Sequence, residues 1–150
     1  MTEFSKCNKK NNMKTFQCIL IIFANLTVFS QNAVPDNLWL GDTEFENKIK
    51  GANGFEDANK IIVVEFYADF NKANCFKEWA QLDAPYYRVD VAFTPIAAKK
   101  YRVRMAPTII LFKGGSKEKV FKAGLDLLLP TNLKEINEAI ADLKKLAAFE

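Results

Sequence analysis

The pattern of apolar and polar positions predicts four β-strands. Two uninterrupted runs of β-branched and aromatic residues, Lys60–Tyr67 and Thr108–Lys113, are typical of strands buried on both faces of a sheet. Tyr87–Val91 reads as a third, shorter strand. Gly114 and Gly115 predict a tight hairpin turn into a fourth strand at Lys119–Ala123, because consecutive glycines accept the positive φ angles that such turns need.

Helical spacing and capping residues predict four helices. Asp42 precedes apolar residues at helical spacing, and Gly51 and Gly54 are expected to end that helix. Asn71–Gln81 and Pro95–Tyr101 also read as helices. The last helix begins with two residues in capping-box spacing and carries one apolar face; these residues are Asn132 and Glu135, followed by Leu133, Ile136, Ile140 and Leu143.

The order of these elements predicts an α/β domain. A short apolar patch at Asn37–Leu40 adds a first strand, so the order becomes β-α-β-α-β-α-β-β-α. Such an order gives a mixed central β-sheet flanked by α-helices on both faces. No repeat, low-complexity tract or block of like charge divides residues 31–150, so we expect one domain there.

Residues 1–30 read as an N-terminal extension and a secretory signal peptide. Met13–Ser30 contains a lysine, an apolar run from Cys18 to Phe29 and a small residue before the expected cleavage after Ser30. The run is too short for an ordinary transmembrane helix, and an uncleaved anchor is the alternative. We therefore expect an exported protein, periplasmic or extracellular, with no stable membrane span after signal cleavage.

Composition and charge exclude several classes of function. The chain has 150 residues, of which 49% are hydrophobic and 26% charged, as in folded proteins. Residues 1–30 hold four lysines and one glutamate, which accounts for the whole net charge of +3. The remaining body is neutral, so we expect no nucleic-acid partner. The chain has no histidine, which excludes Ser-His-Asp and Cys-His catalysis. No glycine-rich phosphate loop or ligand cluster suggests a cofactor or metal.

Two local strings resemble the thioredoxin superfamily. Residues 64–70, VEFYADF, are similar to the strand that leads into the active site of protein disulfide isomerase domains. Residues 101–115, YRVRMAPTIILFKGG, are similar to the family's segment from the third helix through the cis-proline into the next strand. The resemblance covers about residues 38–146 and implies a thioredoxin-like fold.

The resemblance breaks down where the family carries its two cysteines. Members that exchange disulfides have Trp-Cys-x-x-Cys after this strand, and the ungapped register places Asn71 and Asn74 at the two cysteine positions. Cys75 follows one residue later and reaches the second cysteine position only through a one-residue insertion. Neither register supplies two thiols, so an intramolecular dithiol–disulfide cycle is excluded.

Asn71 and Cys75 have different expected roles in the helix at this position. Asparagine is among the best N-cap residues, so we expect Asn71 to cap the helix. Cys75 would lie in the first turn, where the helix dipole and nearby Lys72 and Lys77 favour a reactive thiolate. The alternative is a buried, inert cysteine.

Glu65 interrupts an apolar strand, and we expect its side chain to be buried. In the family an acid at this position assists proton transfer to the inner cysteine. The equal alternative here is that Glu65 no longer has this role and is hydrogen bonded in a polar pocket. A buried carboxylate has to be neutral or hydrogen bonded. We therefore expect Glu65→Gln to stabilise the protein at neutral pH.

Pro107 marks the expected substrate-binding surface. The resemblance implies a cis bond between Ala106 and Pro107, beside which family members pair their backbone with an extended peptide. Phe70, in the position of the family's tryptophan, is expected at the surface beside it, so Phe70, Met105, Ala106 and Pro107 form a candidate peptide-binding patch. The alternative is that Pro107 only fixes the fold.

Three functions follow from the sequence. The first is an exported thioredoxin-like protein that lacks the Cys-x-x-Cys pair and binds polypeptide clients through the cis-proline surface. The second is a monothiol oxidoreductase in which Cys75 forms mixed disulfides with a thiol-bearing client. The third is a structural protein in which Cys75 links two chains into a homodimer.

Overall fold

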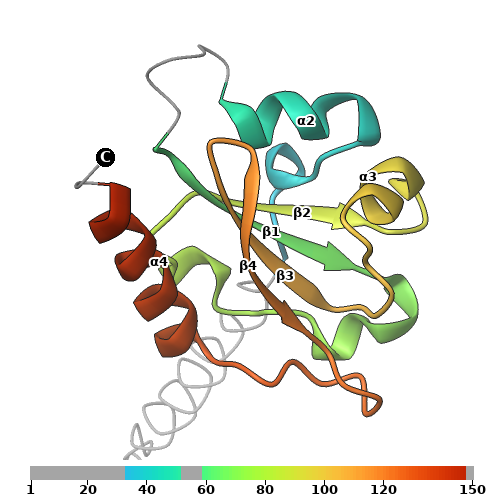
Figure 1. Ribbon diagram of the computed structural model, residues 1–150. Coiled ribbons are helices and arrows are strands. Elements are labelled where there is room, and N and C mark those ends of the chain that lie inside the picture. Colours follow the sequence, from blue (N-terminus) through green and yellow to red (C-terminus); the bar gives the residue numbers. More distant parts are fainter. Residues whose placement is uncertain (1–32, 52–58, 148–150) are drawn as a thin grey trace, which may run out of the picture. The chain divides into compact units, whose positions relative to one another are not determined.

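The computed structural model of the protein describes residues 33–51 and 59–147 (Figure 1). The sequence predictions for residues 1–30 and for Gly54 lie outside these residues. Within the described ranges, no helix is both long and apolar enough to cross a membrane.

A mixed four-stranded sheet forms the centre of the fold (Figure 1). The strands are β1 (Ile61–Tyr67), β2 (Tyr86–Asp90), β3 (Thr108–Lys113) and β4 (Ser116–Lys122), in the spatial order β2-β1-β3-β4. β1 runs parallel to β2 and antiparallel to β3, and β4 forms an antiparallel edge strand beside β3. The four predicted strands are therefore present, with ends that shift by a few residues.

Helices cover both faces of this sheet, as predicted. Helix α2 (Asp42–Lys50) and helix α3 (Pro95–Lys100) pack on one face, and helix α4 (Leu133–Ala147) packs on the other. Gly51, with a φ of 81°, ends α2. The backbone N–H of Glu135 donates to the Asn132 side chain at the start of α4, which confirms the predicted cap.

Two of the predicted elements are wrong. The first strand, expected at Asn37–Leu40, is a 3₁₀ helix η1 (Asp36–Leu38) followed by a single parallel bridge between Trp39 and Arg88. The helix expected over Asn71–Gln81 is replaced by two short 3₁₀ helices, η2 (Asp69–Asn74) and η3 (Trp79–Gln81). Cys75 has extended backbone angles between them, so it does not lie in the first turn of a helix.

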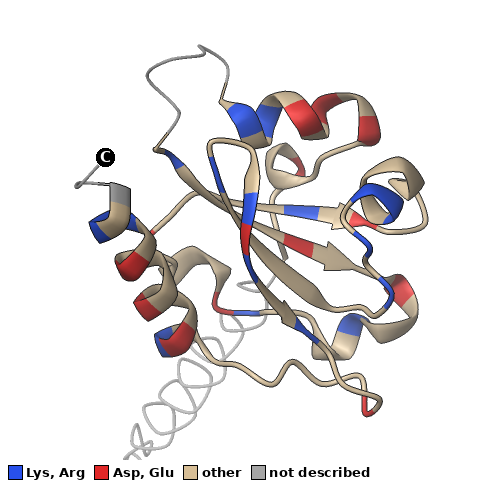
Figure 2. Cartoon of the chain, viewed as in Figure 1, with Lys and Arg blue, Asp and Glu red and all other residues tan. Residues whose placement is uncertain are grey.

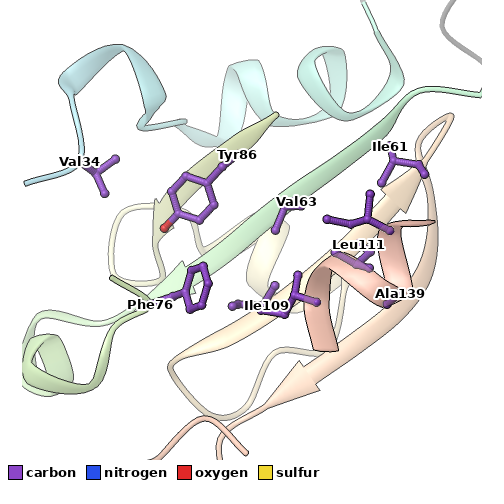
Figure 3. Packing of buried hydrophobic residues seen from close by; sticks show 10 residues of the cluster. Val34, Ile61, Val63, Phe76, Tyr86, Ile109, Leu111 and Ala139 are labelled. Atoms are coloured by element: carbon purple, nitrogen blue, oxygen red, sulfur yellow. The ribbon is translucent and has the colours of Figure 1, made fainter. Parts of the chain in front are cut away.

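The sheet separates two apolar cores because alternate residues of each strand point to opposite faces. Ile62, Val64 and Ile110 face α2 and α3, where Phe45 packs against Phe66 and Phe112. The opposite core contains residues from β1, β2, β3, α4 and the segment between η2 and η3 (Figure 3). Its members include Ile61, Val63, Phe76, Tyr86, Ile109, Leu111, Ile136 and Ile140.

Side chains from α2 and α4 fix neighbouring segments. The Asp42 carboxylate accepts hydrogen bonds from the backbone N–H groups of Ile96 and Ala97, so it caps α3 from a distant part of the sequence. On the other face, Asn137 accepts from the Asp83 N–H and donates to the Gln81 carbonyl. These bonds hold the irregular chain before β2 against α4.

Candidate functional site

The first feature of the site is a buried ion pair between Glu65 on β1 and Arg88 on β2. These residues are direct partners in the parallel register, and the side chains of both are almost completely buried. Arg88 Nη2 donates to Glu65 Oε2 over 2.8 Å, and Arg88 Nε donates to the same oxygen over 3.0 Å. The Tyr86 hydroxyl also donates to Glu65 Oε2.

The same ion pair holds the backbone of Phe76, the residue after Cys75. The Phe76 N–H donates to Glu65 Oε1 over 2.8 Å, and Arg88 Nη2 donates to the Phe76 carbonyl over 2.9 Å. An α-helix would instead direct this N–H to a carbonyl four residues earlier. The buried side chains therefore take the hydrogen bonds that the predicted helix needs, and the chain after Asn74 follows an irregular path.

Arg88 is stabilised as a cation in spite of its burial. Burial opposes the charge, but the Glu65 carboxylate and Tyr86 raise the pKa of Arg88 overall. Its guanidinium carbon lies 5.4 to 5.8 Å from the ring centroids of Trp39, Tyr67 and Tyr86. Burial and the adjacent Glu65 carboxylate raise the pKa of Tyr86, which keeps its hydroxyl protonated.

Glu65 is therefore buried and hydrogen bonded, as predicted, but the arginine beside it was not expected. Its partner is a guanidinium, so the carboxylate is compensated by charge and by hydrogen bonds to both oxygens. The sequence contains a partial signal for this pair, since Glu65 is the one charged residue in Ile61–Tyr67 and Arg88 is the one basic residue in Tyr86–Asp90. The missing information was the register that places them side by side.

The second feature is Asn71, whose side chain joins three segments. Its Nδ2 donates to the Ala106 carbonyl over 2.8 Å and to the Leu127 carbonyl over 2.9 Å. Its Oδ1 accepts from Asn74 Nδ2 over 2.8 Å. Asn71 is buried, and its backbone angles are not helical. The prediction that Asn71 caps a helix is therefore wrong, because no helix begins at Asn71 and its Oδ1 accepts from the Asn74 side chain instead of a backbone N–H.

Leu127 adopts an unusual backbone conformation where it accepts this hydrogen bond. Its φ is 60°, in the left-handed region that side chains with a Cβ rarely occupy. Such a conformation costs on the order of 1 kcal/mol and persists when surrounding contacts compensate for it. The bond from Asn71 is one such contact. No sequence signal singled out Leu127.

The four residues of the predicted peptide-binding patch differ in exposure. The Ala106–Pro107 peptide bond is cis, but Ala106 and Pro107 are both buried. Met105 is half-buried, and Phe70 is 77% exposed. Because the Ala106 carbonyl already accepts from Asn71, the surface that remains for a ligand is mainly side chain.

Cys75 is partly exposed and lines a shallow cavity of about 400 Å³ with Lys77 and Leu129. It is the one cysteine of the described residues, in which no group of three acidic, cysteine or histidine side chains lies close enough to hold a metal ion.

Comparisons with known proteins match this architecture to thioredoxins. A thioredoxin H-type from Brassica campestris is 32% identical over 106 residues, which cover 65% of this chain and 84% of the relative. The chain belongs to the thioredoxin superfamily. A Pyricularia oryzae protein named thioredoxin-2 is 33% identical over 81 residues, and this thioredoxin-like chain spans 47% of its length. No protein-family profile matches.

Solved thioredoxin structures agree with the fold. Schistosoma mansoni thioredoxin superposes with a TM-score of 0.52 at 25% identity, covering 69% of this chain and 92% of the other. A mutant thioredoxin from Halobacterium salinarum gives a TM-score of 0.51 at 21% identity, covering 71% of this chain and 89% of the other. The thioredoxin-like fold expected from the sequence is therefore confirmed.

The ion pair leads to a prediction opposite to the one from sequence. Glu65→Gln removes the negative charge and leaves Arg88 buried without compensation, so we expect it to lower the free energy of unfolding by about 3 kcal/mol at pH 7. Denaturant unfolding measures the change. Glu118→Gln, on the exposed part of β4, is the matched control and should stay within about 0.5 kcal/mol. A Glu65→Gln variant as stable as the wild type would contradict this role.

Asn71 gives a second prediction. Asn71→Asp replaces an amide donor with a carboxylate that faces two carbonyl oxygens, so we expect a loss of about 3 kcal/mol in the free energy of unfolding at pH 7. Asn74→Ala removes one partly buried hydrogen bond and should cost about 1 kcal/mol. The same unfolding measurement compares them, and equal losses would mean that Asn71 does not hold the two carbonyls.

Proposed function

We propose that this thioredoxin-like protein binds polypeptide clients at the carboxyl ends of β1 and β2 and does not run a dithiol–disulfide cycle. The observation that carries the proposal is the hydrogen-bonded pair Asn71 and Asn74. These residues have the i, i+3 spacing of the family's cysteines, and Asn71 donates to the Ala106 carbonyl beside Pro107. The register without an insertion is thereby favoured, and it puts amides where the two thiols would be.

Exposed apolar side chains support client binding at this edge. Phe70 follows the carboxyl end of β1, and Phe93 and Ile96 follow that of β2. The three side chains are 77%, 81% and 70% exposed. Because β1 and β2 are adjacent and parallel, their carboxyl ends share one edge of the sheet, where open α/β sheets commonly bind ligands. Large apolar side chains gathered at one edge are typical of interaction surfaces.

The mode of binding differs from the strand addition expected from sequence. Ala106 is buried and its carbonyl is already hydrogen bonded, so it offers little backbone to a client strand. Phe70 and half-buried Met105 remain as contacts from the predicted patch, while Ala106 and Pro107 are buried. Export through the leader at residues 13–30 belongs to the proposal and rests on the sequence pattern alone.

Cys75 supports a second candidate function. Its thiol lines a cavity and is partly exposed, so a reaction partner can reach it. Such a thiol would form a mixed disulfide with a client or with a second copy of the chain. Thiol labelling of the folded protein tests its accessibility, and a non-reducing gel tests for a linked dimer.

Client binding is tested with a reduced, unfolded polypeptide by isothermal titration. Phe70→Ser removes an exposed aromatic contact, so we expect it to weaken binding about tenfold. Leu146→Ser is the matched control, since Leu146 is an exposed apolar residue on α4, and it should leave the affinity within about twofold. Equal effects of the two variants would remove the support for binding at this edge.

The absence of a dithiol cycle gives a further prediction. With a thioredoxin reductase system, insulin reduction by the wild type should not exceed that by Cys75→Ser, because no second thiol resolves a mixed disulfide. Adding Asn71→Cys and Asn74→Cys to the Cys75→Ser protein should create an intramolecular disulfide, since the Asn71 and Asn74 side chains are already in contact. Mass spectrometry after alkylation detects it. Two free thiols in a folded, oxidised variant would contradict the register.

A further inference from the structure

A basic groove lies beside edge strand β4, on the side of the sheet that carries α2 and α3. The chain between α3 and β3 lines one side, and β4 with the residues that follow it lines the other; the volume is about 590 Å³. Apolar side chains also line the groove, from both of its sides and from the sheet. They are Val103, Met105, Ile110, Val120 and Leu125. Val120 lies opposite Ile110 in the β3–β4 register, so the two share this face.

Four exposed cations line the basic groove: Arg102, Arg104, Lys117 and Lys122. Figure 2 shows basic residues both on β4 and on the chain between α3 and β3. Among the residues that the structure describes, no acidic residue lines the groove and none of the four cations forms an ion pair. Glu118 and Asp126 are neighbours of lining residues in the sequence, but neither lines the groove. The field inside it is therefore positive.

The backbone conformation of Arg102 helps to position one of these cations. Arg102 has a φ of 57° at the end of α3, and its N–H donates to the Lys99 carbonyl. Glycine or asparagine is the favoured residue in this conformation after a helix. An arginine here accepts a backbone cost on the order of 1 kcal/mol. The conformation sets a guanidinium beside the groove, and guanidinium groups bind carboxylates in bidentate geometry.

We propose that the basic groove binds an acidic polypeptide segment in which apolar side chains alternate with carboxylates. The apolar side chains of such a segment can contact the exposed parts of Val120 and Leu125, while its carboxylates lie near the cations along the sides of the groove. The volume lies in the range of ligand sites with an apolar lining and a few charged groups. Met105 belongs both to the groove and to the proposed client surface, so this inference rests on the proposed function and names the client's chemistry.

The test uses the full chain and a fluorescein-labelled peptide of alternating glutamate and leucine, followed by fluorescence anisotropy. We expect binding that weakens as salt rises, and no comparable binding of a glutamine–leucine peptide. Arg104→Glu and Lys122→Glu should each weaken binding about tenfold, because each replaces attraction with repulsion.

Lys119→Glu is the matched control. Lys119 is also on β4, but it pairs with Leu111 on the opposite face, and its ammonium lies 5.3 Å from the Phe121 ring centroid. The same charge change there should alter the affinity less than about twofold. If Lys119→Glu and Lys122→Glu weaken binding equally, the affinity depends on the net charge of the protein and not on the groove. That result would overturn the groove as the binding site.

The two proposals fail separately. If the unfolded client binds in a Phe70-dependent way but the glutamate–leucine peptide does not bind, the groove proposal falls and the proposed function stands. The opposite result is that the peptide binds through Arg104 and Lys122 while Phe70→Ser does not weaken binding of the unfolded client. The groove would then bind an acidic segment without the client surface, and the proposed client surface would be wrong. Stronger binding of a single-stranded oligonucleotide than of the peptide would overturn the peptide assignment.

Discussion

The buried pair of Glu65 and Arg88 is the constraint on which the local structure depends. Two charges removed from water are costly, and their attraction offsets this cost only if the remaining hydrogen-bonding capacity is also satisfied. The main chain of Phe76 provides both a donor to Glu65 and an acceptor for Arg88. Residue 76 therefore cannot direct its N–H into a helix, and the segment from Cys75 to the start of β2 is irregular apart from the short 3₁₀ helix η3.

This constraint also positions the side chains at the carboxyl end of β1. η2 occupies the short interval between β1 and the fixed Phe76, so it is held at both ends. Asn71 lies inside η2 and reaches the carbonyls of Ala106 and Leu127, while Phe70 remains outside. On the other side, α4 holds the chain at Gln81 and Asp83 through Asn137. The candidate surface thus follows from polar contacts between segments far apart in the sequence.

The sequence predicted the parts of the fold that depend on local pattern. Thr108–Lys113 is a strand with the predicted ends, and the face of α4 that includes Ile136 and Ile140 packs as expected. The errors arose where a distant partner decides the conformation. Asn71 has the chemistry of a helix cap, yet its amide hydrogens bind carbonyls 35 and 56 residues away. The arginine partner of Glu65 was not predicted, because Arg88 is 23 residues further along the chain.

The pair of asparagines has a consequence for how such a surface would be regulated. An amide hydrogen bond neither accepts nor releases electrons, whereas a dithiol alternates between two covalent forms as its environment supplies or withdraws them. The contact between Asn71 and Asn74, and the hold of Asn71 on the Ala106 carbonyl, are the same under both conditions. Occupancy of the adjoining surface would then be set by concentration and affinity alone, with no recycling enzyme needed to reset it.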